Sequence, residues 1–113
     1  MRKINIGIIG CGYWGPNLIR NLSQNREVNI HTLCDISEDR LKGMQKFFPQ
    51  ANFTKNPKDV FNSREVDAVV IAVGVRLHYD MAKQALLSGK HCLVEKPLAL
   101  TYKEAIELVE LAQ

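Results

Sequence analysis

Short strand-like runs of apolar residues alternate with helical segments along this chain. Runs 3–9 and 28–34 are rich in β-branched residues, and 67–73 is apolar almost throughout. Unbroken apolar character over so few residues is typical of a parallel strand that is covered on both faces. Two further strand signals lie at 51–54 and 91–95, so the pattern predicts five strands.

Segments with helical spacing separate these strands. Helices are expected over about residues 15–25, 38–48, 57–61, 75–88 and 102–112. Strands that alternate with helices indicate an α/β fold with right-handed crossovers. We therefore expect a doubly wound parallel sheet with strand order 3-2-1-4-5, in a three-layer α/β/α arrangement.

Individual residues define the ends and the buried faces of these helices. Ser37 and Thr101 are expected N-caps, while Pro49 and Gly89 are expected stops. The predicted buried faces are Leu18, Ile19 and Leu22; Leu41, Met44 and Phe48; Met81, Ala82, Ala85 and Leu86; and Ala105, Leu108, Val109 and Ala112.

Composition limits the kind of protein without naming a function. The 113 residues are 46% hydrophobic and 24% charged, which is typical of one soluble globular domain, residues 1–113. The net charge of +3 is scattered, so we expect neither a nucleic-acid nor a membrane partner. Without a secretory signal or a spanning segment, the cytoplasm is the expected location.

The cysteines are odd in number and lack the spacing of a metal site. Cys11, Cys34 and Cys92 form no C-x-x-C pair. We interpret them as small buried apolar residues in a reducing compartment, and we expect no metal. Cys11 could instead be reactive toward oxidants, since it lies in a glycine-rich loop.

That loop is Gly10-Cys11-Gly12-Tyr13-Trp14-Gly15, between the first strand and the first helix. G-x-G-x-x-G in this context indicates dinucleotide binding in a Rossmann fold, with the phosphates on the N–H groups that open the helix. Tyr13 and Trp14 are expected to contact cofactor or substrate, or else to pack on the first helix. The alternative for the whole loop is an ordinary turn that binds nothing.

Asp35 is the second candidate binding residue. It follows the second strand, about 25 residues after Gly10, close to the offset of a ribose-binding acid. A carboxylate there favours NAD over NADP, although Arg40 could accommodate the additional phosphate. The alternative is a solvent-facing residue at a strand end, or one that assists a helix cap.

Glu95-Lys96-Pro97 is the third candidate feature, after the fifth strand. Strand carboxyl ends face the ligand crevice in open α/β sheets. Lys96 is therefore a candidate catalytic residue, which could donate to a substrate oxygen and stabilise developing negative charge. The alternative is an exposed lysine at the start of a loop. The peptide bond before Pro97 could be cis, as X-Pro bonds sometimes are.

The glycine loop with Pro16 and Asn17, His78 at a helix start, and the block 89–99 together resemble the Gfo/Idh/MocA oxidoreductases. Inositol, glucose and nucleotide-sugar dehydrogenases belong to that family, and the form of the loop is most similar to the nucleotide-sugar branch. The resemblance spans essentially the whole chain. It implies an N-terminal NAD(P)-binding domain followed by a substrate domain, which this chain does not contain.

The resemblance also implies roles for single residues. Gly10, Gly12 and Gly15 would hold the pyrophosphate, Asp35 the ribose, and Lys96 would lie near nicotinamide and the reacting hydroxyl. His78 would lie beside the cofactor or simply pack its own helix. Gly74 and Glu95 complete the predicted cofactor-binding set. One departure is Val73-Gly74, where family members often have Thr-Pro.

The expected function is the cofactor domain of an NAD(P)-dependent dehydrogenase. Hydride would pass between nicotinamide and a hydroxyl-bearing carbon of a sugar, nucleotide sugar or cyclitol. The chain alone is expected to bind NAD weakly without turnover. Apolar surface that the substrate domain would cover could drive self-association. The competing hypothesis is a non-catalytic Rossmann-like module that binds a nucleotide or forms oligomers.

Overall fold

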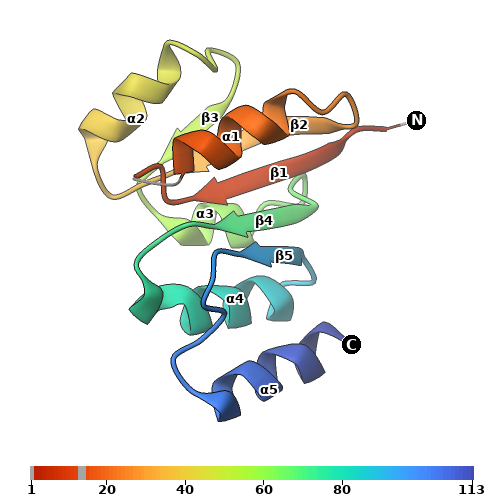
Figure 1. Cartoon of the computed structure of the whole chain (residues 1–113). Helices are drawn as coiled ribbons and strands as arrows, with labels where there is room; N and C mark the ends of the chain where they lie inside the picture. The colour runs from red at the N-terminus through yellow and green to blue at the C-terminus, as the bar shows by residue number, and fades with distance from the viewer. Residues whose placement is uncertain (1, 13–14) are drawn as a thin grey trace.

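A computed structural model describes residues 2–12 and 15–113 of the chain, which form a parallel sheet of five strands (Figure 1). Its strand order is β3-β2-β1-β4-β5, as predicted. Every neighbouring pair is parallel. The predicted contacts of Tyr13 and Trp14 lie outside the described residues. The strands are β1 (Ile4–Ile9), β2 (Val28–Cys34), β3 (Asn52–Thr54), β4 (Ala68–Ile71) and β5 (His91–Val94).

Helices cover both faces of the sheet and complete the three layers (Figure 1). One face carries the first two helices and the other carries the last three. A 3₁₀ turn, η1 (Val75–Leu77), precedes the fourth. The helices are α1 (Gly15–Ser23), α2 (Glu38–Gln45), α3 (Pro57–Phe61), α4 (His78–Leu87) and α5 (Tyr102–Ala112).

Two hydrophobic cores lie on the two faces of the sheet. Ile19 of α1 and Leu41 of α2 pack on one face, and both are at most 6% exposed. Phe61 of α3, Ala85 of α4 and Leu108 of α5 pack on the other. Successive side chains of a strand point to opposite faces, so central strands covered on both sides are apolar at nearly every position. This explains the unbroken apolar run that predicted β4.

The predicted helix caps are confirmed. The Ser37 hydroxyl accepts from the Arg40 N–H, and the Thr101 hydroxyl accepts from the Glu104 N–H. Gly89 adopts a φ of 78° just after α4. That left-handed conformation favours glycine and ends the helix.

Several predicted helix and strand ends are wrong. α2 ends at Gln45 instead of continuing to Pro49, because the Phe47 N–H donates only three residues back, to the Met44 carbonyl, and a tighter turn replaces the α-helix. β4 ends at Ile71, two residues early, and the segment that starts at Val75 becomes α-helical only at His78.

The predicted buried stripe of α5 is also wrong in part. Leu108 is 3% exposed, but Val109 is 49% exposed and Ala112 is exposed as well. α5 packs mainly against α4 at the end of its layer (Figure 1), so only a narrow face of this helix is covered.

Candidate functional site

Backbone hydrogen bonds align the carboxyl ends of the five strands. The Gly10 N–H donates to the Cys34 carbonyl at 2.8 Å, and the Ala72 N–H donates to the Ile9 carbonyl at 2.8 Å. The backbone N–H groups of Asp35 and Glu95 donate in the same way, to the carbonyls of Thr54 and Ile71 respectively. Predicted site residues from three separate segments of the chain therefore start from one edge of the sheet.

The backbone of Gly10 requires glycine on two grounds. Its φ is 101°, a conformation that other residues rarely adopt. A Cβ atom built here would also lie 2.5 Å from the Ala72 carbonyl oxygen, so β1 and β4 could not approach so closely. At Gly12 a Cβ would lie 3.1 Å from Nη1 of Arg40. Gly10 thus permits a close approach to the backbone of Ala72, and Gly12 leaves space for the end of the Arg40 side chain. Their contact with a ligand stays a prediction.

Asp35 holds the glycine loop. Its side chain is buried, and Oδ2 accepts from the Cys11 N–H at 2.8 Å. Oδ1 accepts from the Ser37 N–H at 2.8 Å, just before α2. The contact with Ser37, the N-cap of α2, matches the predicted alternative of a residue that assists a helix cap, whereas the sequence did not indicate the contact with Cys11. Both contacts rule out the other alternative, a solvent-facing carboxylate. Each carboxylate oxygen has a second acceptor site, so Asp35 can still accept ribose hydroxyls.

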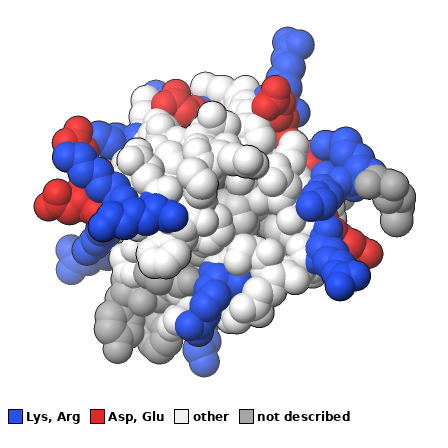
Figure 2. Space-filling view, turned by 90° about the horizontal axis from the view of Figure 1, so that it is seen from above, with Lys and Arg blue, Asp and Glu red and all other residues white. Residues whose placement is uncertain are grey.

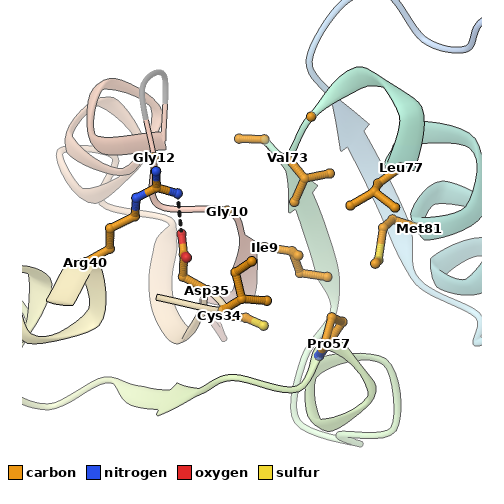
Figure 3. A pocket seen from close by; sticks show the side chains of 13 residues that line it. Ile9, Gly10, Gly12, Cys34, Asp35, Arg40, Pro57, Val73, Leu77 and Met81 are labelled. Carbon is orange, nitrogen blue, oxygen red and sulfur yellow. Dashed lines mark ion pairs between the residues drawn. The ribbon is translucent and has the colours of Figure 1, made fainter. Parts of the chain in front are cut away.

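Arg40 lies over this carboxylate from α2 (Figure 3). Its Nη1 is 3.7 Å from Oδ2 of Asp35, while 57% of the Arg40 side chain remains exposed. A partly exposed arginine beside a buried acid places both signs of charge at one point of the loop. That pair is suited to control whether a dinucleotide with an additional phosphate on its ribose is accepted.

A cavity of about 370 Å³ lies between the glycine loop and α4 (Figure 3). It brings together four predicted residues, Gly10, Gly12, Asp35 and Gly74. Its size falls in the range of small-molecule sites. Apolar residues with no site role predicted from the sequence also line it: Ile36, Pro57, Val73, Leu77 and Met81. The places of Ile36 and Val73 two residues after β2 and β4 could have suggested one, whereas Leu77 and Met81 lie further along the chain, in η1 and α4.

Lys96 and Glu95 do not line that cavity. Both border a separate hollow of about 300 Å³, next to Leu18 of α1 and Leu93 of β5. Lys96 itself is exposed, and the Lys96–Pro97 peptide bond is cis, as considered from the sequence. The carboxyl edge therefore carries two hollows, one at the glycine loop and one at Lys96.

His78, the first residue of α4, is buried at 2% exposure. Its Nδ1 lies 2.7 Å from the Pro97 carbonyl oxygen and its Nε2 lies 2.9 Å from the Val73 carbonyl oxygen. Both ring nitrogens therefore have partners within the chain. Contact of His78 with a cofactor stays a prediction.

The thiols next to the site are poorly suited to redox chemistry. Burial, reinforced by the charge of Asp35, raises the pKa of Cys11 to about 12 and that of Cys34 to about 12. Burial raises the pKa of Cys92 to about 11. Because the thiolate is the reactive form, these thiols should react slowly with oxidants, and the role of small apolar filler fits them better.

Charges are mixed on the face shown in Figure 2, where lysines, arginines and acids surround an uncharged centre. None of the helices described has the length and apolar character needed to cross a bilayer. Among the same residues, no group of three His, Cys, Asp or Glu is placed to hold a metal ion.

Comparison with known proteins agrees with this geometry. The family model GFO_IDH_MocA, described as an oxidoreductase family with an NAD-binding Rossmann fold, matches residues 4–113. Inositol 2-dehydrogenase 2 of Saccharopolyspora erythraea is 34% identical over 108 residues, which is 95% of this chain and 32% of that protein.

Two further relatives cover nearly the whole chain. Glycosyl hydrolase family 109 protein 2 of Shewanella sp. (strain ANA-3) is 34% identical over 122 residues, 100% of this chain and 27% of that protein. The crystal structure of GenD2 from gentamicin A biosynthesis, in complex with NAD, superposes with a TM-score of 0.93 at 25% identity, over 99% of this chain and 32% of that one. The chain thus spans 27% to 32% of the length of these three relatives.

Proposed function

This chain belongs to the Gfo/Idh/MocA oxidoreductases as their NAD-binding Rossmann domain, and from that premise we propose a dehydrogenase function for the protein of which it forms part. The reaction would transfer hydride between nicotinamide and a hydroxyl-bearing carbon of a sugar, nucleotide sugar or cyclitol. The relative named as an inositol 2-dehydrogenase supports this substrate class. The substrate domain predicted from the sequence stays part of the proposal.

The observation that carries the proposal is the buried Asp35 carboxylate in contact with the glycine loop. Asp35, the proposed acceptor for the ribose hydroxyls, lines one cavity with Gly10 and Gly12 of the glycine loop. That loop leads into α1, whose first N–H groups would donate to the pyrophosphate. The lack of a side chain at Gly10 lets the loop approach the Ala72 backbone, and the lack of one at Gly12 would let a ligand approach the loop. The residues of this cavity therefore fit the cofactor of the family.

Lys96 supplies the chemistry at the other hollow of the same edge. When bound there, nicotinamide would provide the site that accepts or gives hydride. The exposed Lys96 ammonium would donate a hydrogen bond to the substrate hydroxyl oxygen and stabilise the negative charge that develops on it. Glu95, whose backbone is tied to Ile71, would fix the direction from which Lys96 approaches.

NAD is the cofactor that we propose. A phosphate on the ribose would meet the Asp35 carboxylate, whereas the nearby Arg40 would attract it. The Asp35 side chain is 3% exposed and held by two backbone N–H groups, so it cannot easily turn away from a bound phosphate. The repulsion should therefore exceed the attraction of the exposed arginine.

Titration with NADH and NADPH tests this assignment. The fluorescence of Trp14, the single tryptophan of the chain, reports binding. We expect saturable quenching, with NADH bound more tightly than NADPH. Loss of hydrogen bonds to a charged group is worth about 1.5–3 kcal/mol, so Asp35→Asn should weaken NADH binding by roughly 10-fold to 100-fold.

The ratio of the two affinities separates ligand contact from damage to the loop. If Asp35→Asn only loosens the loop, both cofactors should lose affinity equally. If Asp35 contacts the ribose, NADPH should lose less, because a repulsion disappears and Arg40 stays. Asp67→Asn is the matched control, since Asp67 also accepts a backbone N–H but lies at the other edge of the sheet. Absence of quenching at millimolar NADH would refute cofactor binding by this chain.

Glycoside cleavage is a second candidate, because a relative of equal identity is named a glycosyl hydrolase. The two candidates differ in what the full-length protein should release. Net formation of NADH from polyols or sugars supports the dehydrogenase. Release of the aglycone from aryl glycosides, without net NADH, would favour the hydrolase.

A further inference from the structure

The outer side of α5 carries a stripe of large apolar residues that stays exposed to solvent. Tyr102, Ile106 and Val109 are 82%, 40% and 49% exposed. Their spacing of four and then three residues places them on one side of a helix. A continuous exposed apolar patch marks a contact with another molecule more often than an isolated exposed side chain does. This stripe is therefore a candidate interaction surface, and the charges beside it indicate which partner it fits.

The stripe faces away from α4. Glu107 of α5 accepts from the Tyr79 hydroxyl and lies 3.0 Å from Nζ of Lys83, so this side of α5 is turned toward α4. At 3.6 residues per turn, Val109 lies about 200° round the helix from Glu107. Figure 1 shows α5 at the end of its layer, beyond α4. A further helix can therefore extend this layer next to α5 without displacing α4.

Two exposed charges border the stripe along one edge. Lys103 lies in the first turn of α5 and Glu110 in the last turn. Ile106 lies three residues after the lysine and four before the acid, so it sits between them on the helix surface. The helix dipole favours acids at the start of a helix and bases at its end, which is the reverse of this arrangement. These two charges therefore do little to stabilise α5 by itself, and they are available to a partner.

We propose that this stripe is the interface of a symmetric dimer, in which α5 packs antiparallel against α5 of a second copy of the chain. A twofold interface uses the same patch on both copies. With the axis near Ile106, Lys103 lies opposite Glu110 of the second copy, and Glu110 lies opposite its Lys103. Tyr102 of each copy then packs against Val109 of the other. A parallel pair would instead place like charges side by side. The dimer does not depend on the proposed function.

Sedimentation of the chain over a range of concentrations tests whether the dimer forms. One side of an 11-residue helix is a small contact, at the low end of specific interfaces, so we expect a weak and reversible dimer. The mass should rise from monomer to dimer between micromolar and millimolar concentration, and then stop, because a twofold contact closes on itself. A chain that stays monomeric at millimolar concentration would overturn the proposal, and the stripe would then belong to another partner, such as the proposed substrate domain. Growth beyond the dimer would overturn it as well.

A lysine in the stripe tests where the interface lies. Val109→Lys places a charge in the centre of the contact and should abolish the dimer, with little effect on unfolding in urea because the side chain is half exposed. Phe47→Lys is the matched control, since Phe47 is a 73% exposed apolar residue just past the end of α2, on the other face of the sheet. This variant should dimerise normally. Loss of the dimer in Phe47→Lys, or its persistence in Val109→Lys, would contradict the proposed interface.

Exchange of the two charges tests the antiparallel arrangement. Lys103→Glu alone, or Glu110→Lys alone, removes both ion pairs across the twofold axis and should weaken the dimer by roughly 2-fold to 30-fold. The double variant Lys103→Glu with Glu110→Lys restores both pairs with their signs exchanged, so its dimer should again form as in the unmodified chain. A general change in surface charge would not produce that recovery. Unchanged dimerisation in the single variants, or no recovery in the double variant, would overturn the antiparallel pairing.

Discussion

The two edges of this parallel sheet are built from similar residues but are used differently. Each edge contains a carboxylate that accepts a backbone N–H, Asp35 at the carboxyl edge and Asp67 at the amino edge. The Asp67 carboxylate also bonds to the guanidinium of Arg2 at 2.8 Å. Asp35 borders a cavity instead, with an arginine at 3.7 Å. Its surroundings leave room for a ligand.

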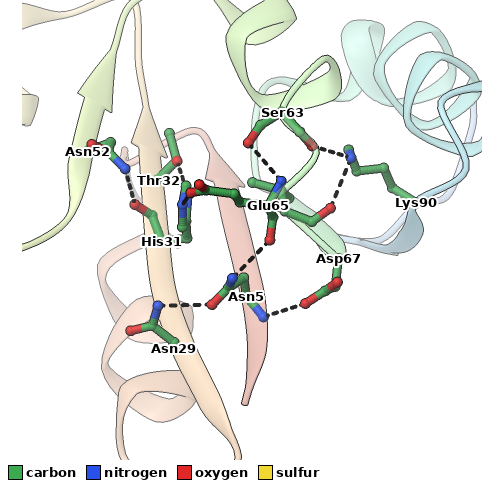
Figure 4. Close-up of polar contacts among 10 residues, drawn as sticks. Asn5, Asn29, His31, Thr32, Asn52, Ser63, Glu65, Asp67 and Lys90 are labelled. Atoms are coloured by element: carbon green, nitrogen blue, oxygen red, sulfur yellow. Dashed lines mark hydrogen bonds and ion pairs between the residues drawn. The ribbon is translucent and has the colours of Figure 1, made fainter. Parts of the chain in front are cut away.

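The amino edge is a closed network of polar side chains (Figure 4). Asn5 donates to the Glu65 carbonyl and accepts from Asn29. Lys90 donates to the carbonyls of Ser63 and Val66, at 2.6 and 2.9 Å. These contacts join segments that are distant in the sequence, so this edge contributes to stability.

The comparison shows that polar residues at strand ends do not by themselves mark a site. Both edges have them, but the cavity at the carboxyl edge brings a buried carboxylate, Asp35, together with Gly10 and Gly12 of the glycine loop. The two edges can therefore be perturbed separately. Changes at the carboxyl edge should affect ligand binding, and changes at the amino edge should affect stability alone.

The largest effect is expected from Gly10→Ala. The new methyl group would meet the Ala72 carbonyl oxygen at 2.5 Å in a backbone conformation that alanine rarely adopts. Strain of this kind costs about 1–3 kcal/mol, to which the forced separation of β1 and β4 adds. We expect a lower unfolding free energy in urea and loss of measurable NADH binding.

Gly43→Ala is the matched control, because a Cβ atom at Gly43 of α2 would meet nothing within 4 Å. Alanine is favoured over glycine inside a helix by about 1 kcal/mol, so this variant should be slightly more stable with unchanged NADH affinity. Normal stability and binding in Gly10→Ala would show that the loop tolerates a side chain, and the account of the carboxyl edge would be wrong.

A smaller effect, on stability alone, is expected from Lys90→Met. The change removes two hydrogen bonds from a charged donor and leaves two carbonyls without it. The unfolding free energy should fall by about 2 kcal/mol. The exposed Lys42→Met on α2 should change it little. If NADH affinity fell in folded Lys90→Met, the two edges would not be independent.

Much of the fold could be predicted because local sequence and tertiary packing agree. β2 has the predicted bounds, Val28–Cys34, and the strand order follows from the crossover rule. The end of α2 could not be predicted, because Phe47 and Phe48 continue the apolar pattern past Gln45, whereas the Phe47 N–H already donates only three residues back, to Met44, in a tighter turn. The exposure of Val109 depends on how much of α5 packs against α4, and the hydrophobic periodicity of α5 carries no information on that packing.

The site was predictable in type and less so in arrangement. Motif spacing indicated Gly10, Gly12 and Asp35, and one cavity brings them together with Gly74. The separation of Lys96 from that cavity depends on the path of the chain after β5. Asp35 accepts from the Cys11 N–H, and the ring of His78 contacts the carbonyls of Val73 and Pro97. These contacts depend on tertiary structure, and no local sequence pattern predicts them.

Mapping bound NADH on the amide spectrum of the chain tests the central claim most directly. The account predicts that the N–H signals of Gly10, Gly12, Asp35 and Gly74 shift with saturation, while those of Asn5, Asp67 and Lys90 at the other edge stay in place. Shifts confined to the amino edge, or no saturable shift at millimolar NADH, would contradict it.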